Sequence, residues 1–198
     1  NRSFTELRDA AGKGDPVAQR LVANAYLTGE GVKQDLVEAV KWLRLSAEQR
    51  DPLAQYVLGI LHDEGRGVPQ DLREAVKWYE RAALQGLPDA QFNLALCYAK
   101  GEGLPKDSKK AAEWLLKAAT AGDSQAQSRL GLAYITGNGV ERNPTEAAIW
   151  LRKAAYPPGE DAKAQFFLGR LYQEGEGVTQ SAAEAVRAFL RAAAKEWP

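Results

Sequence analysis

The chain has 198 residues, and its 26 lysine and arginine side chains balance 26 aspartate and glutamate side chains. A net charge of zero provides no long-range positive field to attract phosphate backbones, so we expect no nucleic-acid partner. No run approaches the roughly 18 apolar residues that a membrane-spanning helix needs, so we expect no membrane span.

A Gly-x-Gly tripeptide occurs five times along the chain. The copies begin at Gly29, Gly65, Gly101, Gly137 and Gly175. The first four follow one another at a period of 36 residues, and the fifth comes 38 residues after the fourth. Such a period indicates a stacked array of repeated units, which has a groove where a globular enzyme has a pocket.

Two helical stretches are predicted in each unit, one before and one after the Gly-x-Gly. Residues 1–15 form a half-unit that aligns with the end of a second helix, and full units follow at about 16–51, 52–87, 88–123, 124–161 and 162–198. We expect first helices over 16–28, 52–64, 88–100, 124–136 and 162–174, and second helices from about Leu36, Leu72, Ser108, Pro144 and Ala182. The two extra residues of the last step lie in the Tyr156–Gly159 turn, so the stacking register survives. We expect residues 1–198 to form a single solenoid domain.

Helix boundaries are signalled by short-range chemistry. Asp15-Pro16 and Asp51-Pro52 place a capping side chain before a proline at the first helical position. The second helices carry the capping-box pattern, as Asp35 with Glu38, Asp71 with Glu74, Asn143 with Glu146 and Ser181 with Glu184. Lys110 breaks this pattern in the third unit, so we expect that second helix to start less firmly. The first glycine of each Gly-x-Gly lies where a helix ends in a left-handed residue.

A tryptophan recurs at the repeat period on the second helices, at Trp42, Trp78, Trp114 and Trp150. Paired alanines follow on the same face, for example Ala82-Ala83. This pattern favours rings packed against small side chains over a ligand platform. Cys97 replaces apolar residues in a first-helix column, which predicts a small buried thiol rather than a nucleophile.

Each unit reads approximately Ala-Gln-x-x-Leu-Gly-x-x-Tyr-x-x-Gly-x-Gly-Val-x-x-Asp-x-x-Glu-Ala-x-x-Trp-x-x-x-Ala-Ala, best seen over 54–83 and 126–155. This pattern resembles the Sel1-like repeat family, relatives of the tetratricopeptide repeats with a longer internal loop. The resemblance implies an all-α protein, a right-handed α/α solenoid of five helix-turn-helix repeats preceded by half a repeat. It also implies a concave surface lined by the first helices and an adaptor role in protein assembly, often in bacterial envelopes. His62 departs from the tyrosine column, and Ala188 departs from the tryptophan column.

The residues that could support catalysis are few, so we expect no enzymatic activity, no catalytic residues, no metal site and no cofactor. His62 is the only histidine and stands in a column that is tyrosine in the other units, which favours a half-buried spacer over a general base. Glu30, Glu102 and Glu176 recur once per unit in the Gly-x-Gly loops. Stacking would separate them by roughly 18–20 Å, two interhelical spacings, whereas paired-carboxylate catalysis needs about 5–10 Å.

First-helix positions that do not repeat in character lie three or four residues apart and therefore form one stripe per helix. The stripe of the first unit is the most polar, with Arg20, Asn24 and Thr28. From the later units we predict a partner-binding surface with an apolar centre and a polar, arginine-containing rim, which is the composition of a protein or peptide site. Its predicted residues are Tyr56, Ile60, Asp89, Phe92, Asn93, Leu96, Lys100, Arg129, Leu132, Phe166 and Arg170. The alternative is that these residues pack against adjoining units or a missing cap.

Two functional hypotheses follow. The first is a non-enzymatic module that binds a protein or peptide in its concave groove, as a bacterial adaptor or an immunity or inhibitor-type protein whose partner is a secreted effector or an envelope protein. It predicts that Tyr56→Ala with Phe92→Ala abolishes partner capture. The second is an envelope hydrolase of cell-wall or β-lactam-like substrates, which would need a localised acid–base pair such as one built on His62.

The chain begins at Asn1, without methionine and already inside the repeat pattern. This start indicates a processed or trimmed product, although no charged-then-apolar signal segment is present in the sequence. We therefore expect a periplasmic or otherwise exported protein rather than a cytoplasmic one.

Overall fold

The computed structural model describes residues 3–157 and 160–195, and these residues form eleven α-helices and no strand. The chain divides into two compact units. The first contains the residues up to Cys97 together with Gly101–Pro105, and the second contains Tyr98–Lys100 and the residues from Lys106 onward. The predicted limits at residues 1 and 198 and the Pro158-Gly159 part of the last turn lie outside the described residues.

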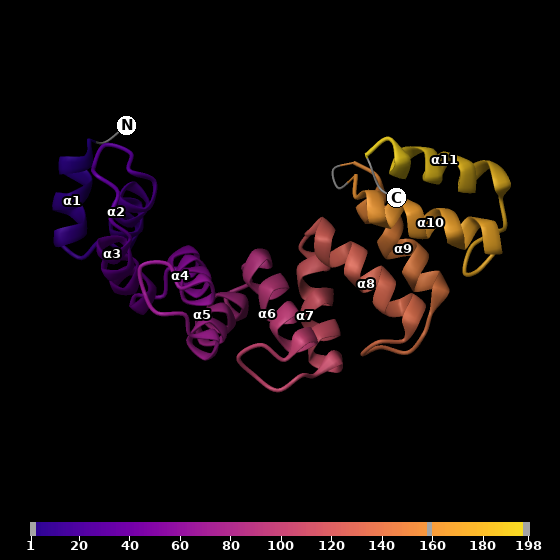
Figure 1. Ribbon diagram of the computed structural model, residues 1–198, viewed down its shortest axis with the longest axis horizontal. Coiled ribbons are helices and arrows are strands. Elements are labelled where there is room, and N and C mark those ends of the chain that lie inside the picture. Colours follow the sequence, from indigo (N-terminus) through magenta and orange to yellow (C-terminus); the bar gives the residue numbers. More distant parts are fainter. Residues whose placement is uncertain (1–2, 158–159, 196–198) are drawn as a thin grey trace. The chain divides into compact units, whose positions relative to one another are not determined.

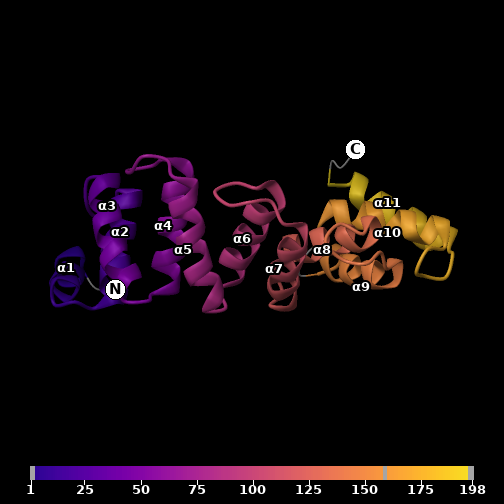
Figure 2. The same cartoon turned by 90° about the horizontal axis from the view of Figure 1, so that it is seen from below.

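In the first unit, α1 (Phe4–Gly12) is the predicted half-unit helix. It is followed by the pairs α2 (Pro16–Thr28) with α3 (Leu36–Glu48) and α4 (Pro52–Glu64) with α5 (Leu72–Leu84), and then by α6 (Pro88–Lys100), which is assigned to this unit as far as Cys97. The two helices of each pair lie side by side in both views (Figures 1 and 2). The predicted first-helix bounds are therefore confirmed here.

The second unit continues the same alternation. It contains α7 (Ser108–Thr120), the pair α8 (Ser124–Thr136) with α9 (Pro144–Ala155), and the pair α10 (Ala162–Glu174) with α11 (Ala182–Ala193). Helix α7 packs on α8, and α9 packs on α10. In both units, therefore, second helices contact the first helix of the following repeat, namely α1 with α2, α3 with α4, α7 with α8 and α9 with α10, as the periodicity predicts.

First helices begin at an aspartate side chain in four of the five repeats. Asp15, Asp51, Asp123 and Asp161 each accept a hydrogen bond from a backbone N–H two or three residues later. Helix α6 is the exception, because Leu87 holds the N-cap position and provides no side-chain acceptor.

The second helices use only half of the predicted capping box. Asp35, Asp71, Asn143 and Ser181 accept from the backbone N–H of the glutamate three residues on. The reciprocal bond is missing because the N–H of each N-cap residue already donates to a first-helix carbonyl; Asp35 N–H, for example, donates to Tyr26 O at 3.0 Å. Asp107 caps α7 with both of these bonds. The cap of α7 therefore has the same hydrogen bonds as the other second helices, and no reciprocal glutamate bond is lost at Lys110; the weaker start expected for α7 stays a prediction.

The two glycines of each Gly-x-Gly have different roles. The first glycine ends its helix with φ between 68° and 80°, the left-handed conformation that the sequence predicts. The second glycine lies against the start of the preceding second helix, and a Cβ atom at Gly67 would be 2.5 Å from Leu36 O. Gly103, Gly139 and Gly177 abut Leu72, Ser108 and Pro144 in the same way. Close stacking of repeats therefore requires the second glycine.

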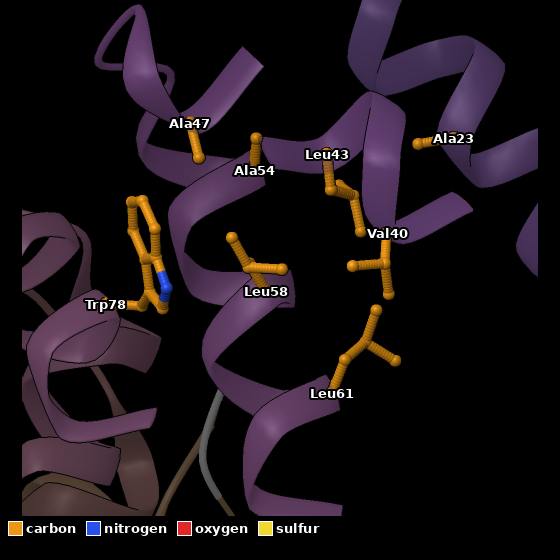
Figure 3. Packing of buried hydrophobic residues seen from close by; sticks show 8 residues of the cluster. All are labelled: Ala23, Val40, Leu43, Ala47, Ala54, Leu58, Leu61 and Trp78. Atoms are coloured by element: carbon orange, nitrogen blue, oxygen red, sulfur yellow. The ribbon is translucent and has the colours of Figure 1, made fainter. Parts of the chain in front are cut away.

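Apolar columns form the core between neighbouring helix pairs. In the first unit, Leu58 of α4 lies between Trp78 of α5 and the Val40 and Leu43 side chains of α3 (Figure 3). Trp78 is 3% exposed, and Arg81 stacks on its ring at 4.5 Å from the ring centroid. This tryptophan is a packing residue, which agrees with the prediction for its column.

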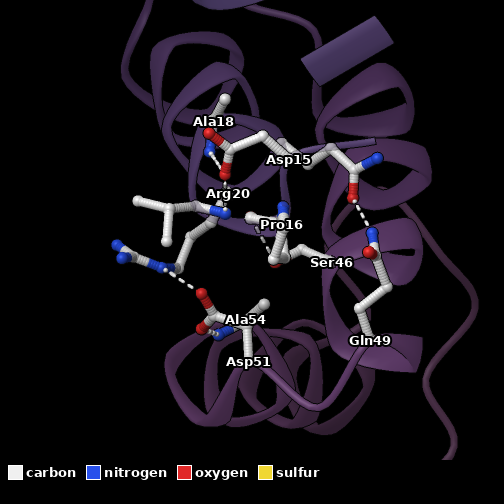
Figure 4. Close-up of polar contacts among 10 residues, drawn as sticks. Asp15, Pro16, Ala18, Arg20, Ser46, Gln49, Asp51 and Ala54 are labelled. Carbon is white, nitrogen blue, oxygen red and sulfur yellow. Dashed lines mark hydrogen bonds and ion pairs between the residues drawn. The ribbon is translucent and has the colours of Figure 1, made fainter. Parts of the chain in front are cut away.

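A buried glutamine on every first helix joins it to the preceding second helix. Gln19, Gln55, Gln91, Gln127 and Gln165 each donate from Nε2 to the carbonyl of an alanine in or near the last turn of that helix, at 2.8–3.2 Å. In the first repeat the Oε1 atom of Gln19 also accepts a hydrogen bond from Gln49 at 2.8 Å. Beside it, Arg20 and Asp51 form an ion pair at 3.0 Å (Figure 4). These glutamines position each repeat on the one before it.

Candidate partner-binding surface

First-helix residues that recur are buried, whereas one column of varied positions between them retains solvent access. Val22, Leu58, Leu94, Leu130 and Leu168 occupy one column, and all are fully buried. Two residues further along each helix, Asn24, Ile60, Leu96 and Leu132 are half-buried and Arg170 is exposed. In this column, variation in chemistry therefore coincides with access to solvent, as a recognition surface requires.

Six of the eleven predicted binding residues lie in the first unit. Tyr56, Ile60, Asn93 and Leu96 are half-buried, and Asp89 is exposed. Phe92 is only 8% exposed, so most of its ring faces other parts of the chain rather than solvent. The Phe92→Ala substitution would therefore remove packing contacts within the chain as well as any contact with a partner.

Tyr56 and Asn93 are brought together through Tyr79 of α5. The Tyr56 and Tyr79 rings lie 6.0 Å apart between centroids, and the Tyr79 hydroxyl contacts Asp63 Oδ2 at 3.4 Å. Burial and the nearby Asp63 carboxylate raise the pKa of Tyr79, and a hydrogen bond with Asn93 opposes that rise. Asn93 and part of the Tyr56 ring therefore support the fold, which leaves Ile60, Leu96 and Asp89 as the more accessible residues of this unit.

The other five predicted residues lie in the second unit. Lys100, Arg129 and Arg170 are exposed, and Leu132 is half-buried. Arg170 pairs with Glu174 at 2.7 Å. Phe166 packs edge-to-face on Phe167, with 5.4 Å between ring centroids, and lies 5.6 Å from Phe189. The continuous groove predicted across both units remains a prediction.

The candidates for chemistry are buried or ion-paired. His62 is 7% exposed, so it is buried rather than half-buried as expected, and burial lowers its pKa below 6.5. Cys97 is buried, as predicted. Glu176 pairs with Arg142 at 2.6 Å. Over residues 3–157 and 160–195, no group of three or more His, Cys, Asp or Glu side chains is placed to hold a metal ion. Within the same ranges, no helix is long and apolar enough to cross a membrane.

One surface feature was missed at the sequence level. A hollow of about 830 Å³ lies between α1 and α2, and its walls include the apolar side chains of Phe4, Leu7, Val17 and Leu21. The stripe of α2 was judged polar from Arg20, Asn24 and Thr28. Val17 and Leu21, which lie four residues apart, were the signal that could have revealed the hollow, because this spacing puts both on one face of the helix and both are exposed.

These features define a helical-repeat protein, built from stacked helix pairs with a repeated core and a varied first-helix face. The Sel1 repeat profile matches residues 16–51, 52–87, 88–123, 124–156 and 162–196. The chain therefore belongs to the Sel1 repeat family.

Solved structures agree with this assignment. The c5321 protective antigen of uropathogenic Escherichia coli is 36% identical with a TM-score of 0.93, and the match covers 98% of this chain and 41% of that one. A Sel1 repeat protein of Oxalobacter formigenes is also 36% identical, with a TM-score of 0.80, and the match covers 92% of this chain and 74% of that one. The immunity protein Pa5087 of Pseudomonas aeruginosa shares the fold at 22% identity and a TM-score of 0.51, with 96% of this chain and 73% of that one covered.

This chain spans about two fifths of the length of the Escherichia coli protein. No curated protein matches the chain.

Proposed function

We propose that the chain is a non-enzymatic binding module that holds a protein or peptide partner on the varied face of its first helices. The observation that carries this proposal is the coincidence of chemical variation with solvent access in the column that contains Ile60, Leu96 and Leu132, beside columns that are fully buried. The Sel1 repeat fold supports a role in protein–protein interaction. The proposal includes the continuity of residues 1–198 as one solenoid domain whose first helices line a concave groove.

Within this proposal the partner is a secreted effector or an envelope protein, and the chain is a bacterial adaptor or an immunity-type protein. One of the solved structures described above is named a protective antigen, and another is named an immunity protein. The burial of His62 and the ion pair of Glu176 favour binding over the hydrolase hypothesis. No observation favours a second function.

The test uses charge reversals at exposed positions, because truncation of Tyr56 or Phe92 would also remove packing contacts. Asp89→Lys in the first unit and Arg129→Glu in the second each alter the face without emptying the core. Proteins from the source organism are captured on immobilised wild-type chain and on each variant, and the bound protein is identified. We expect the variants to lose a specific partner by about tenfold or more in affinity, as hot-spot substitutions do.

Arg73→Glu on α5 and Lys109→Glu on α7 are the matched controls, since both lie exposed on second helices. Each should retain the partner and unfold at the wild-type temperature. Equal capture by the wild-type chain and both face variants would remove the first-helix face from consideration.

A further inference from the structure

A hollow lies at the carboxyl ends of α9 and α11, beside the first turn of α10. Its volume is about 390 Å³, and its walls include Ala155, Gln165, Arg191 and Lys195. The second repeat has an equivalent hollow of about 350 Å³. The residues at the same places in its walls are Ala47, Gln55, Arg81 and Gln85. The hollow is therefore a feature of the repeat, with one example in each compact unit.

The two hollows differ in one hydrogen bond. In the second repeat, Gln85 Nε2 donates to Gln55 Oε1 at 2.8 Å. Lys195 holds the place of Gln85 in the fifth repeat, and its Nζ atom pairs instead with Glu160 Oε2 at 2.7 Å. The Oε1 atom of Gln165 is left with no hydrogen-bond partner among the residues that the structure describes.

This unpartnered acceptor is buried and fixed in position. Gln165 is 4% exposed, and its Nε2 atom donates to Ala155 O at 2.8 Å, which sets the direction of the carboxamide. A buried acceptor without a donor has lost its hydrogen bonds with water and gained none in return. Gln91 Oε1 also lacks a partner in the described part of the chain, but Gln91 lines neither of these hollows. A ligand that donates to Gln165 Oε1 would therefore recover the lost interaction.

Glu160 keeps Lys195 away from this acceptor. Glu160 precedes the N-cap of α10, and the residue before the N-cap is glycine at Gly14, Gly86 and Gly122. Its φ of 49° is left-handed, a conformation that a side chain disfavours. The Glu160 carboxylate nevertheless lines the hollow and holds the Lys195 ammonium. This strained residue thus leaves vacant the place that Gln85 fills in the second repeat.

The polarity of the walls selects the chemistry of a ligand. Gln165 Oε1 needs a donor, whereas the Arg191 guanidinium, which lies 4.8 Å from the centroid of the Tyr156 ring, offers donors to an acceptor. A carboxylate has no hydrogen to donate to Gln165, and an ammonium group would face the positive charges of Arg191 and Lys195. A primary carboxamide has both a donor and an acceptor. It is also the group that reaches the equivalent acceptor in the first two repeats, from Gln49 and Gln85.

We propose that the hollow at Gln165 binds a primary carboxamide, the group that glutamine and asparagine side chains carry. The NH₂ of the ligand donates to Gln165 Oε1, and its oxygen accepts from Arg191. None of the wall residues named above belongs to the predicted partner-binding surface. This site therefore does not depend on the function proposed for the first-helix face.

Two probes test the site and distinguish the sources of the carboxamide. One is the capped peptide acetyl-Ala-Gln-Ala-N-methylamide, whose side chain is its sole primary carboxamide, and the other is propionamide. Each is titrated into the ¹⁵N-labelled full chain, and the side-chain NH₂ signals of Gln165 are followed by NMR. We expect these signals to shift and saturate. The same peptide with glutamate or norleucine in place of glutamine should bind at least about tenfold more weakly, because it leaves the buried acceptor unpaired.

Tighter binding of the glutamine peptide than of propionamide would identify a protein segment as the source of the carboxamide. Equal binding of the two would identify a free small-molecule amide. Either result supports the proposed chemistry.

Three variants show whether the vacant acceptor is responsible. Lys195→Gln supplies an internal donor, as Gln85 does, and should lose binding at Gln165 by about tenfold or more without a fall in the unfolding temperature. Lys109→Gln removes another exposed lysine of the same unit and should bind as the wild type does. Gln85→Ala removes the internal donor of the second repeat, so the Gln55 NH₂ signals should then respond to the peptide.

The absence of a saturable shift at Gln165 with either probe would overturn the proposal and leave Gln165 Oε1 to solvent. Equal binding of the glutamine and glutamate peptides would overturn it in favour of a carboxylate site at Arg191. Binding at wild-type strength by Lys195→Gln would show that Gln165 Oε1 is not the contact, which would also overturn it.

Discussion

At the scale of single residues, the N-cap of α6 is the one first-helix start without a side-chain acceptor. Leu87 has φ −71° and ψ 114°, and the capping Asp51 and Asp123 have nearly the same backbone angles. The backbone at Leu87 is therefore already arranged for a cap that its side chain cannot provide.

Leu87→Asp should stabilise the chain by about 1 kcal/mol, because the new carboxylate would accept from the free N–H groups of the first turn. Urea unfolding measures the change in the free energy of unfolding. Leu87→Glu serves as the control, since its longer side chain is a poor N-cap and should give no gain. A loss of stability in Leu87→Asp would mean that the packing of Leu87 outweighs the missing cap.

His62 links stability to pH. Burial lowers its pKa below 6.5, Arg44 lowers it further, and Glu74 and Asp71 oppose the shift. The unfolded chain therefore takes up a proton near pH 6.5 that the folded chain resists. The contribution is fully present above pH 6.5 and is lost as the pH falls from there to the lowered folded-state pKa.

His62→Tyr should remove this pH dependence. It restores the residue of the other first helices and gives Arg44 a hydroxyl acceptor, as Tyr172 gives Arg152 at 2.9 Å. Unfolding free energies of both proteins, measured from about pH 8 to about pH 5, provide the check. The difference between variant and wild type should grow as the pH falls through 6.5. Parallel pH profiles would rule out His62 as the source.

At the scale of elements, the Gly-x-Gly loop sets how closely repeats stack. Gly31 and Gly67 hold the same place in their loops, with φ of 73° and 74°. A Cβ atom would be 3.9 Å from Phe4 Cβ at Gly31 but 2.5 Å from Leu36 O at Gly67. The two glycines therefore have the same left-handed backbone conformation, but only Gly67 lies in close contact with the neighbouring helix.

Gly31→Ala should therefore cost about 1 kcal/mol, the penalty of the left-handed conformation alone. Gly67→Ala should cost at least about 2 kcal/mol, because α3 must also move away. Thermal unfolding of the two variants measures the difference in stability. Equal losses of stability would show that the contact between Gly67 and α3 does not add to the cost of a side chain there. Gly12→Ala, with no neighbour within 4 Å of the new Cβ, controls for the glycine itself.

Capping residues and glycines in the sequence predicted the bounds of the first helices well, whereas contacts between helices were predicted less well. The Asp-Pro starts and glycine ends fixed the first helices to the residue, because both signals act within one turn. The reciprocal half of the capping box failed because a first-helix carbonyl, distant in sequence, takes the N–H of Asp35. Phe92 and Ile60 both vary in sequence, yet Phe92 is buried and Ile60 is half-buried. Variation identifies the face, but packing decides which of its side chains remain accessible.

At the scale of the whole molecule, stability should be graded along the chain. Helix α1 has 9 residues and the other helices have 12 or 13, and helices of these lengths are marginal alone, so each depends on its neighbours. Helix α4 packs on both α3 and α5, whereas the main contacts of α1 are with α2 and those of α11 with α10. The free energy needed to open a helix locally should therefore be lowest at the two ends.

Hydrogen exchange followed by mass spectrometry tests this gradient. We expect peptides from α1 and α11 to exchange at least about tenfold faster than those from α4 and α8, because opening an end helix breaks one interface instead of two. The comparison is made at low denaturant, where local opening dominates, and repeated near the unfolding midpoint, where the differences should shrink as global opening takes over. Equal protection in all four helices at low denaturant would instead show that the repeats open together, in which case coupling between neighbours exceeds the stability of any single helix pair.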